Sequence, residues 1–207
     1  MKDFFLIKYA PEILQHTLEH LFLVGIAIGI AIFVGIPLGI LITRKTYLRQ
    51  PILGIANIFQ TIPSLALFGL LIPVAGIGVL PAIIALTVYS FLPIIRNTYT
   101  GITGVDPAIR EAGRGMGMTD RQLLIQVEIP LAMGVILAGV RVATVIAVGI
   151  ATIAAAIGAG GLGVFIFRGI SVVNDQLILA GAVPAAAIAL LADFVIGWLE
   201  NKLKIKS

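Results

Sequence analysis

Hydrophobic residues in this chain gather into five long runs, which short polar segments separate. A helix needs about 20 apolar residues to cross the hydrocarbon core of a bilayer, and every run reaches that length. The runs cover residues 19–43, 52–75, 79–99, 131–157 and 177–199. We therefore predict an all-α integral membrane protein with five transmembrane helices.

Composition supports this class and limits what else the chain contains. Hydrophobic residues make up 59% of the 207 residues and charged residues only 12%, far from the balance of a soluble domain. Five spans leave too few residues for a separate soluble domain, so we expect a single transmembrane domain over 1–207. The first run is too long for a cleavable signal peptide and no small-residue cleavage site follows it, so the first span is expected to stay. The absence of cysteine excludes disulfides and thiol catalysis.

Basic residues are concentrated in alternate polar segments. One set of segments holds Arg44, Lys45 and Arg49, then Arg96, Arg110, Arg114 and Arg121, then Lys202, Lys204 and Lys206. The other set holds only Lys2, Lys8 and Arg168. Because the cytoplasmic loops of membrane proteins carry the excess of Lys and Arg, we expect the N-terminus outside and the C-terminus in the cytoplasm.

The polar segment at about 100–130 is then cytoplasmic, and its residues predict a short helix. Asp106 is a good N-cap, and Pro107 suits the first helical position, where its missing N–H costs nothing. We expect this helix to run from Pro107 to about Met116. Gly115 and Gly117 allow it to end with a positive φ.

A second short helix is predicted directly after this one. Thr119 and Gln122, three residues later, form the sequence pattern of a capping box. The helix should continue to about Glu128, and Pro130 should mark the entry to the fourth span. The segment would then be two helices joined at a glycine hinge, a shape that fits a cleft on another protein. The alternative is a solvated connector between two spans.

The spacing within this segment resembles the EAA loop of ABC-importer permeases. That loop reads Glu-Ala-Ala, three residues, Gly, nine residues, then Ile-x-Leu-Pro. The matching residues here are Glu111, Ala112, Gly113, Gly117, Val127, Ile129 and Pro130, with three mild departures at Gly113, Val127 and Ile129. The resemblance implies that these residues couple the chain to a separate ATPase subunit, with Glu111 expected to make a charged contact.

Three further segments are similar to the permeases of osmoprotectant ABC importers. They are Gln60-Thr61-Ile62-Pro63-Ser64-Leu65, Leu92-Pro93-Ile94-Ile95-Arg96-Asn97-Thr98-Tyr99 and Gly158-Ala159-Gly160-Gly161-Leu162-Gly163. The similarity implies a small type I importer fold in a prokaryotic plasma membrane. It also implies a second permease subunit (homodimer or heterodimer), an ATPase that binds the ATP and Mg²⁺, and an external binding protein that delivers glycine betaine, choline or carnitine. The chain itself would be neither an enzyme nor a cofactor-binding or nucleic-acid-binding protein.

Two alternatives within transport remain open. A methionine-type or other small-solute ABC permease of similar size is the nearest one. An ion-driven secondary transporter is the other, although such carriers usually show inverted repeats and a carboxylate relay inside the spans. Here Asp193 stands alone well inside a predicted span.

Candidate residues for the translocation path come from the second and fourth spans. Pro63 lies mid-span, where it removes a backbone hydrogen bond and bends a helix, so the break beside Thr61 and Ser64 is a candidate path lining. A tolerated kink is the alternative. Arg141 would be costly facing lipid, and we expect it at a depth where it pairs with Asp193, unless it borders the path or an inner gate.

Two patterns suggest enzymes but lack the remaining parts. His16, Glu19 and His20 fit the His-x-x-Glu-His pattern of some zinc proteases, yet no third ligand is evident, and a polar helix beside the membrane explains the same residues. The stretch 158–163 is glycine-rich, but no Gly-Lys-Ser/Thr follows it, so a phosphate loop is not indicated. We expect a turn or a re-entrant gate element there and no metal site.

Overall fold

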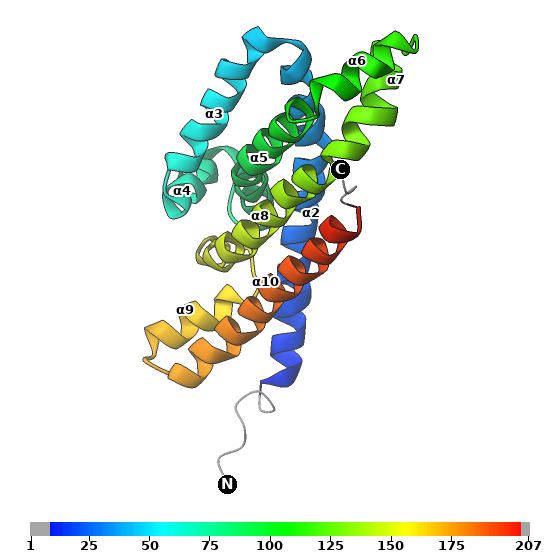
Figure 1. Cartoon of the computed structure of the whole chain (residues 1–207). Coiled ribbons are helices and arrows are strands. Elements are labelled where there is room, and N and C mark those ends of the chain that lie inside the picture. The colour runs from blue at the N-terminus through cyan, green and yellow to red at the C-terminus, as the bar shows by residue number, and fades with distance from the viewer. Residues whose placement is uncertain (1–8, 204–207) are drawn as a thin grey trace.

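The computed structural model describes residues 9–203 as a bundle of helices (Figure 1). The long helices are α2 (Ala10–Arg44), α5 (Val79–Thr103), α8 (Ile129–Ala154) and α10 (Asp175–Leu203). The shorter ones are α3 (Arg49–Thr61), α4 (Ser64–Ala75), α6 (Pro107–Gly115), α7 (Asp120–Leu123) and α9 (Gly163–Ser171). Lys2, Lys8, Lys204 and Lys206, which contributed to the predicted orientation, lie outside the described residues.

Within residues 9–203, four helices are long and apolar enough to cross a membrane. They are α2, α5, α10 and a continuous helix over Asp120–Ile157 that contains α8. The pair α3 and α4 passes the same test as one unit, but it is bent by 103° at the break between Thr61 and Ser64. Counting that pair as one broken span gives five, which confirms the predicted all-α class.

The segment before α8 differs from the expectation of a separate second helix ending near Glu128. The helix that begins at Asp120 continues through a π turn at Leu124–Glu128 directly into α8. The wide turn is closed by the N–H of Ile129, which donates to the carbonyl of Leu124. Pro130 therefore lies inside one continuous helix, where it has no N–H to donate, and the π turn comes directly before it; α7 is the first turn of that helix.

Small residues let the central helices α2, α5 and α8 approach closely. A Cβ on Gly39 of α2 would lie 2.5 Å from Cβ of Thr98 in α5. A Cβ on Gly139 of α8 would lie 2.5 Å from Cβ of Asn97 and 2.8 Å from the carbonyl oxygen of Pro93. Helices in a bilayer associate through such close packing, so these two glycines fix the positions of α2 and α8 on α5.

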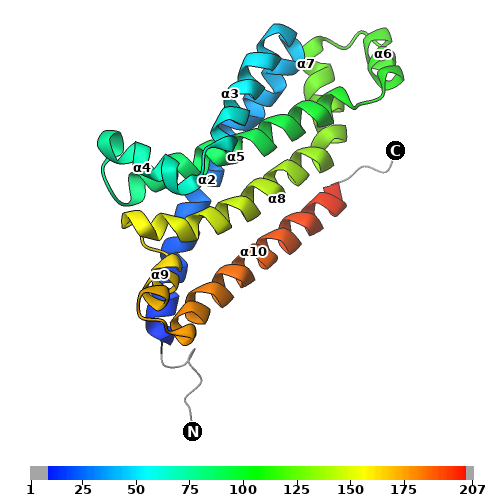
Figure 2. The same ribbon diagram turned by 90° about the vertical axis from the view of Figure 1, so that its left-hand side faces the viewer.

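The two ends of the bundle carry different structures. Figure 2 shows α6 and α7 at one end, near the C-terminal end of α10, and α9 at the other end, beside the start of α10 and the N-terminal part of α2. The helices α3 and α4 lie on the side of α5 away from α10. The segment of EAA spacing is thus separated from the glycine-rich stretch by the length of the bundle.

Candidate coupling and translocation site

The helix α6 and its reversal into α7 are built by local caps. Asp106 accepts a hydrogen bond at 2.8 Å from the N–H of Ala108 at the start of α6. Gly117 adopts φ 82°, and the N–H of Met118 donates to the carbonyl of Gly113 at 3.1 Å, which reverses the chain. Thr119 and Gln122 then form the capping box of α7. Gly115 does not share the positive φ, so Gly117 alone makes the turn.

Gly113 has a packing role that the sequence did not reveal. It is buried, and a Cβ there would lie 2.8 Å from Cδ1 of Leu123 and 3.2 Å from the sulfur of Met118. The missing side chain lets α6 lie against α7, which accounts for glycine where the EAA pattern has alanine. Glu111 and Ala112 lie on the same helix, and their side chains form part of its exposed surface.

The remaining motif residues lie away from that surface. Val127 is half-buried in the π turn, and Ile129 and Pro130 are half-buried at the start of α8. The motif therefore divides into an exposed group on α6 and a group that joins α6 and α7 to the fourth span.

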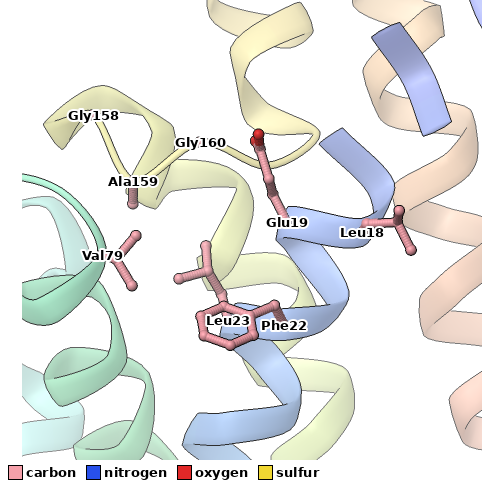
Figure 3. Close-up of a pocket in the computed structure, with 8 residues that line it drawn as sticks. All are labelled: Leu18, Glu19, Phe22, Leu23, Val79, Gly158, Ala159 and Gly160. Carbon is pink, nitrogen blue, oxygen red and sulfur yellow. The ribbon is translucent and has the colours of Figure 1, made fainter. Parts of the chain in front are cut away.

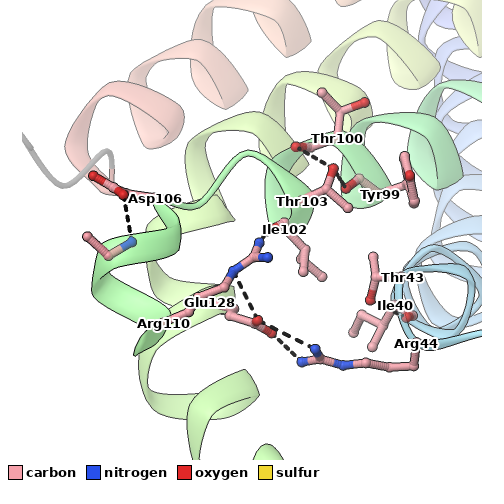
Figure 4. A network of polar contacts seen from close by, with 11 residues as sticks. Ile40, Thr43, Arg44, Tyr99, Thr100, Ile102, Thr103, Asp106, Arg110 and Glu128 are labelled. Atoms are coloured by element: carbon pink, nitrogen blue, oxygen red, sulfur yellow. Dashed lines mark hydrogen bonds and ion pairs between the residues drawn. The ribbon is translucent and has the colours of Figure 1, made fainter. Parts of the chain in front are cut away.

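A buried carboxylate lies between these two groups. Glu128 has a 1% exposed side chain and forms an ion pair with Arg44 at the end of α2 and another with Arg110 of α6 (Figure 4). The distance from Nε of Arg110 to Oε1 of Glu128 is 3.3 Å, and that from Nη1 of Arg44 to the same oxygen is 3.5 Å. Arg110 also donates from Nη2 to the carbonyl of Ile102 in α5. Sequence reasoning missed this cluster; the signal was a charged residue between Val127 and Ile129.

The break at Pro63 is held by hydrogen bonds from α5. Pro93 has no N–H, so the carbonyl of Tyr89 lacks its usual helical donor. The side chain of Gln60 donates to that carbonyl at 2.7 Å. In return, the hydroxyl of Tyr89 donates to the carbonyl of Ile62, directly before Pro63.

The candidate path residues lie at this break. Thr61 and Pro63 are exposed and Ser64 is half-buried. The hydroxyl of Thr61 donates to the carbonyl of Ile58 at 2.7 Å, so its hydrogen is already used within α3. The break is thus a sharp, hydrogen-bonded turn rather than a mild kink.

Arg141 forms the pair with Asp193 that its depth suggested, and a second partner besides. Its Nε lies 3.6 Å from Oδ1 of Asp193 and 3.6 Å from Oε2 of Glu200. The two carboxylates are seven residues apart on α10, so they share one helical face. Gly197 lies between them, where a Cβ would be 2.8 Å from Nη1 of Arg141. The sequence did not indicate Glu200 because it lies beyond the predicted end of the fifth run.

At the opposite end of the bundle, the His16, Glu19 and His20 pattern connects α2 to the glycine-rich stretch. Glu19 accepts hydrogen bonds from the N–H of Gly161 at 2.9 Å and from Gln15 at 3.1 Å, and it pairs with His16 at 2.8 Å. His20 is fully buried and contacts the carbonyl of Val148 at 3.2 Å. Within residues 9–203 no three potential metal ligands lie together. Glu19 thus fastens the stretch to α2, and His20 links α2 to α8.

The stretch itself is a tight turn whose backbone requires glycine. Gly158, Gly160 and Gly161 have φ of 77°, 79° and 78°. Figure 3 shows Glu19 pointing to this loop beside a cavity of about 450 Å³, which Phe22, Leu23, Val79 and Ala159 also line. A Cβ on Gly160 would lie 2.5 Å from Oε2 of Glu19, so the loop and α2 are in direct contact.

Comparison with known proteins gives the family. Residues 35–205 match the family described as "Binding-protein-dependent transport system inner membrane component". The chain belongs to this family. The matched region runs from the last third of α2 through α10, so it includes α6, the break between α3 and α4, and the glycine-rich stretch.

Curated relatives within the family are named for osmoprotectant transport. The chain is 47% identical to the carnitine transport permease protein OpuCB of Listeria monocytogenes, over 95% of this chain and 90% of the relative. It is 46% identical to the osmoprotectant import permease protein OsmW of Salmonella typhimurium, over 97% and 94%. It is 45% identical to the glycine betaine/carnitine/choline transport system permease protein OpuCB of Bacillus subtilis, over 98% and 93%.

Solved structures show the same fold at lower identity. The MetNI methionine ABC transporter in an inward-facing conformation superposes with a TM-score of 0.84 at 24% identity, over 92% of this chain and 95% of that chain. An amino acid ABC transporter gives a TM-score of 0.74 at 22% identity, over 99% and 98%. The predicted type I importer fold is therefore confirmed, and identities this low say nothing about the solute.

Proposed function

We propose that this chain is the membrane-spanning subunit of an ATP-driven importer for quaternary-amine osmoprotectants such as glycine betaine, choline and carnitine. It forms a single permease domain over 1–207 and pairs with a second permease subunit, identical or different. An external binding protein delivers the solute. A separate ATPase subunit binds and hydrolyses the ATP.

One observation supports the proposed class of solute. Relatives between 45% and 47% identical over nearly the whole chain are named for carnitine, choline, glycine betaine or osmoprotectant transport. The methionine transporter shares the fold at only 24% identity. Sequence similarity thus favours quaternary amines over the methionine-type alternative.

The end of the bundle that carries α6 is the proposed docking face for the ATPase. It combines an exposed Glu111 and Ala112 with a rigid turn at Gly117 and a continuous helix from Asp120 into the membrane. A force applied to α6 then reaches the fourth span through Val127, Ile129 and Pro130. The excess of basic residues in the segments at this end supports a cytoplasmic location, with the N-terminus outside.

The break between α3 and α4 is the proposed lining of the translocation path. Thr61, Pro63 and Ser64 expose a turn of backbone at membrane depth, which a bilayer tolerates only where protein or water covers it. Arg141 is held by Asp193 and Glu200, so its charge is largely compensated. We assign it to an inner gate rather than to solute binding, since a fixed cation would repel a quaternary ammonium group.

Competition for uptake tests the solute class. The permease is reconstituted with its ATPase and binding protein, and uptake of labelled glycine betaine is measured against an excess of unlabelled choline, carnitine or methionine. We expect choline or carnitine to compete and methionine to have no effect. Uptake that only methionine inhibits would place the chain among methionine-type permeases.

A further inference from the structure

In the cluster of Glu128, Arg44 and Arg110, side chains from three segments and a backbone carbonyl from a fourth meet at the α6 end. Arg44 ends α2, Arg110 belongs to α6, and Glu128 closes the π turn that leads into α8. The carbonyl of Ile102 in α5 receives the remaining hydrogen bond of Arg110. The cluster therefore touches the first, third and fourth spans together with α6.

Burial shows that the contacts of Glu128 are fixed rather than incidental. A carboxylate with 1% exposure is unfavourable unless cations and donors surround it, and here two guanidinium groups do. Arg44 and Arg110 are themselves 36% and 25% exposed, so both reach inward from the surface to a single buried anion. Removing the anion would leave two like charges facing one another.

Packing makes the same cluster mechanically important. The helix α6 packs against α7 and the π turn, which belong to its own hairpin. Its described polar link to α2 runs through Arg110, Glu128 and Arg44, and its link to α5 through Arg110 and Ile102. A π turn inside an α-helix is rare and is frequent at functional sites, and Glu128 is the last residue of this one.

We propose that Glu128 is a positioning residue that ties α6 to the first and fourth spans, so that movement of α6 is transmitted to both. This inference rests on the proposed function, because it needs an ATPase that moves α6. Glu128 touches neither solute nor partner; it acts by holding Arg44 and Arg110 in one rigid unit. Transmission fails when the unit is broken, even though the spans remain folded.

Two variants separate transmission from folding. Glu128→Gln keeps the shape and removes the charge, whereas Arg44→Gln leaves Glu128 paired with Arg110 and cuts only the link to α2. Each is assembled with the ATPase and purified, and solute uptake per ATP hydrolysed is measured with loaded binding protein. Glu12→Gln is the matched control, because Glu12 pairs with Arg168 at 3.7 Å on the exposed surface at the opposite end.

We expect both variants to assemble and to keep basal ATP hydrolysis, but to lose at least tenfold in uptake per ATP, with Glu128→Asp recovering part of it. The Glu12→Gln control should match the wild type. If Glu128→Gln fails to assemble, Arg44→Gln decides the matter. Unchanged uptake per ATP in the assembled variants overturns the inference, whether or not their yield falls. A wild-type complex without ATP-dependent uptake would instead overturn the proposed function.

Discussion

The side chain of Gln60 donates a hydrogen bond at 2.7 Å to the carbonyl of Tyr89, the carbonyl that Pro93 leaves without a helical donor. Pro93 inside α5 and Pro63 in the break between α3 and α4 are thereby linked. Pro93 frees an acceptor that anchors Gln60, and the hydroxyl of Tyr89 satisfies the carbonyl of Ile62 before Pro63. The sharp turn between α3 and α4 is a consequence of this exchange.

Removing the Tyr89 hydroxyl should loosen that turn. Tyr89→Phe leaves the partly buried carbonyl of Ile62 without its partner, which costs about 1 kcal/mol. We expect a lower thermal stability of the assembled complex and a severalfold lower uptake. Tyr47→Phe changes the same group where the side chain is 73% exposed and should change neither measurement. Equal behaviour of the two variants would show that the bond is unimportant.

Removing Arg141 should affect both of its carboxylate partners, Asp193 and Glu200. Arg141→Leu leaves Asp193 and the half-buried Glu200 without their shared cation on one face of α10, so the amount of assembled complex should fall severalfold. Arg141→Leu with Asp193→Leu should recover part of the yield, and a further Glu200→Gln most of it. Recovered complexes should still transport poorly if Arg141 belongs to a gate. Normal yield and uptake of Arg141→Leu alone would exclude both roles.

We expect glycine to be needed at position 117 because of its positive φ, and not because a side chain there would clash with a neighbour. No atom lies within 4 Å of a Cβ placed there, but φ is 82°, which costs an L-residue about 1–2 kcal/mol. Gly117→Val should insert into the membrane normally yet weaken co-purification of the ATPase and abolish its stimulation by loaded binding protein. Gly117→Asn should be much milder, because asparagine tolerates positive φ. Identical losses in both variants would point to a steric role.

Gly160 and Gly158 offer a matched pair at the other end of the bundle. Both have positive φ, but only at Gly160 would a Cβ meet Glu19, at 2.5 Å; nothing lies within 4 Å at Gly158. Gly160→Ala should push the loop from α2 and reduce uptake more than Gly158→Ala does. The comparison cancels the backbone strain common to both. Equal uptake by the two variants would mean that the contact with Glu19 has no part in transport.

The sequence predicted those features that depend on one segment at a time. The length of a span follows from bilayer thickness, and the caps of α6 and the positive φ of Gly117 follow from local residue types. The 103° bend could not be predicted from Pro63, because it depends on a contact with Tyr89 in another helix. The burial of Glu128 likewise needs Arg44 and Arg110 from distant positions in the chain.

Arg141 lies between these cases. The depth of a residue in the membrane follows from its distance along the span. The pairing of Arg141 with Asp193 could therefore be predicted from the sequence. The contribution of Glu200 depends on where α10 ends and on the absence of a side chain at Gly197, which allows the guanidinium group to lie across that face. Neither the end of α10 nor this role of Gly197 can be predicted by counting residues along the spans.

Uptake into proteoliposomes tests the central claim most directly. The complex is reconstituted with loaded binding protein on the side of α9 and ATP on the side of α6, and accumulation of labelled glycine betaine, choline and carnitine is followed. We predict accumulation that requires ATP and the binding protein, persists when ionophores collapse all ion gradients, and disappears with Gly117→Val. Accumulation that follows an imposed ion gradient and needs no ATP would contradict the account and identify a secondary transporter.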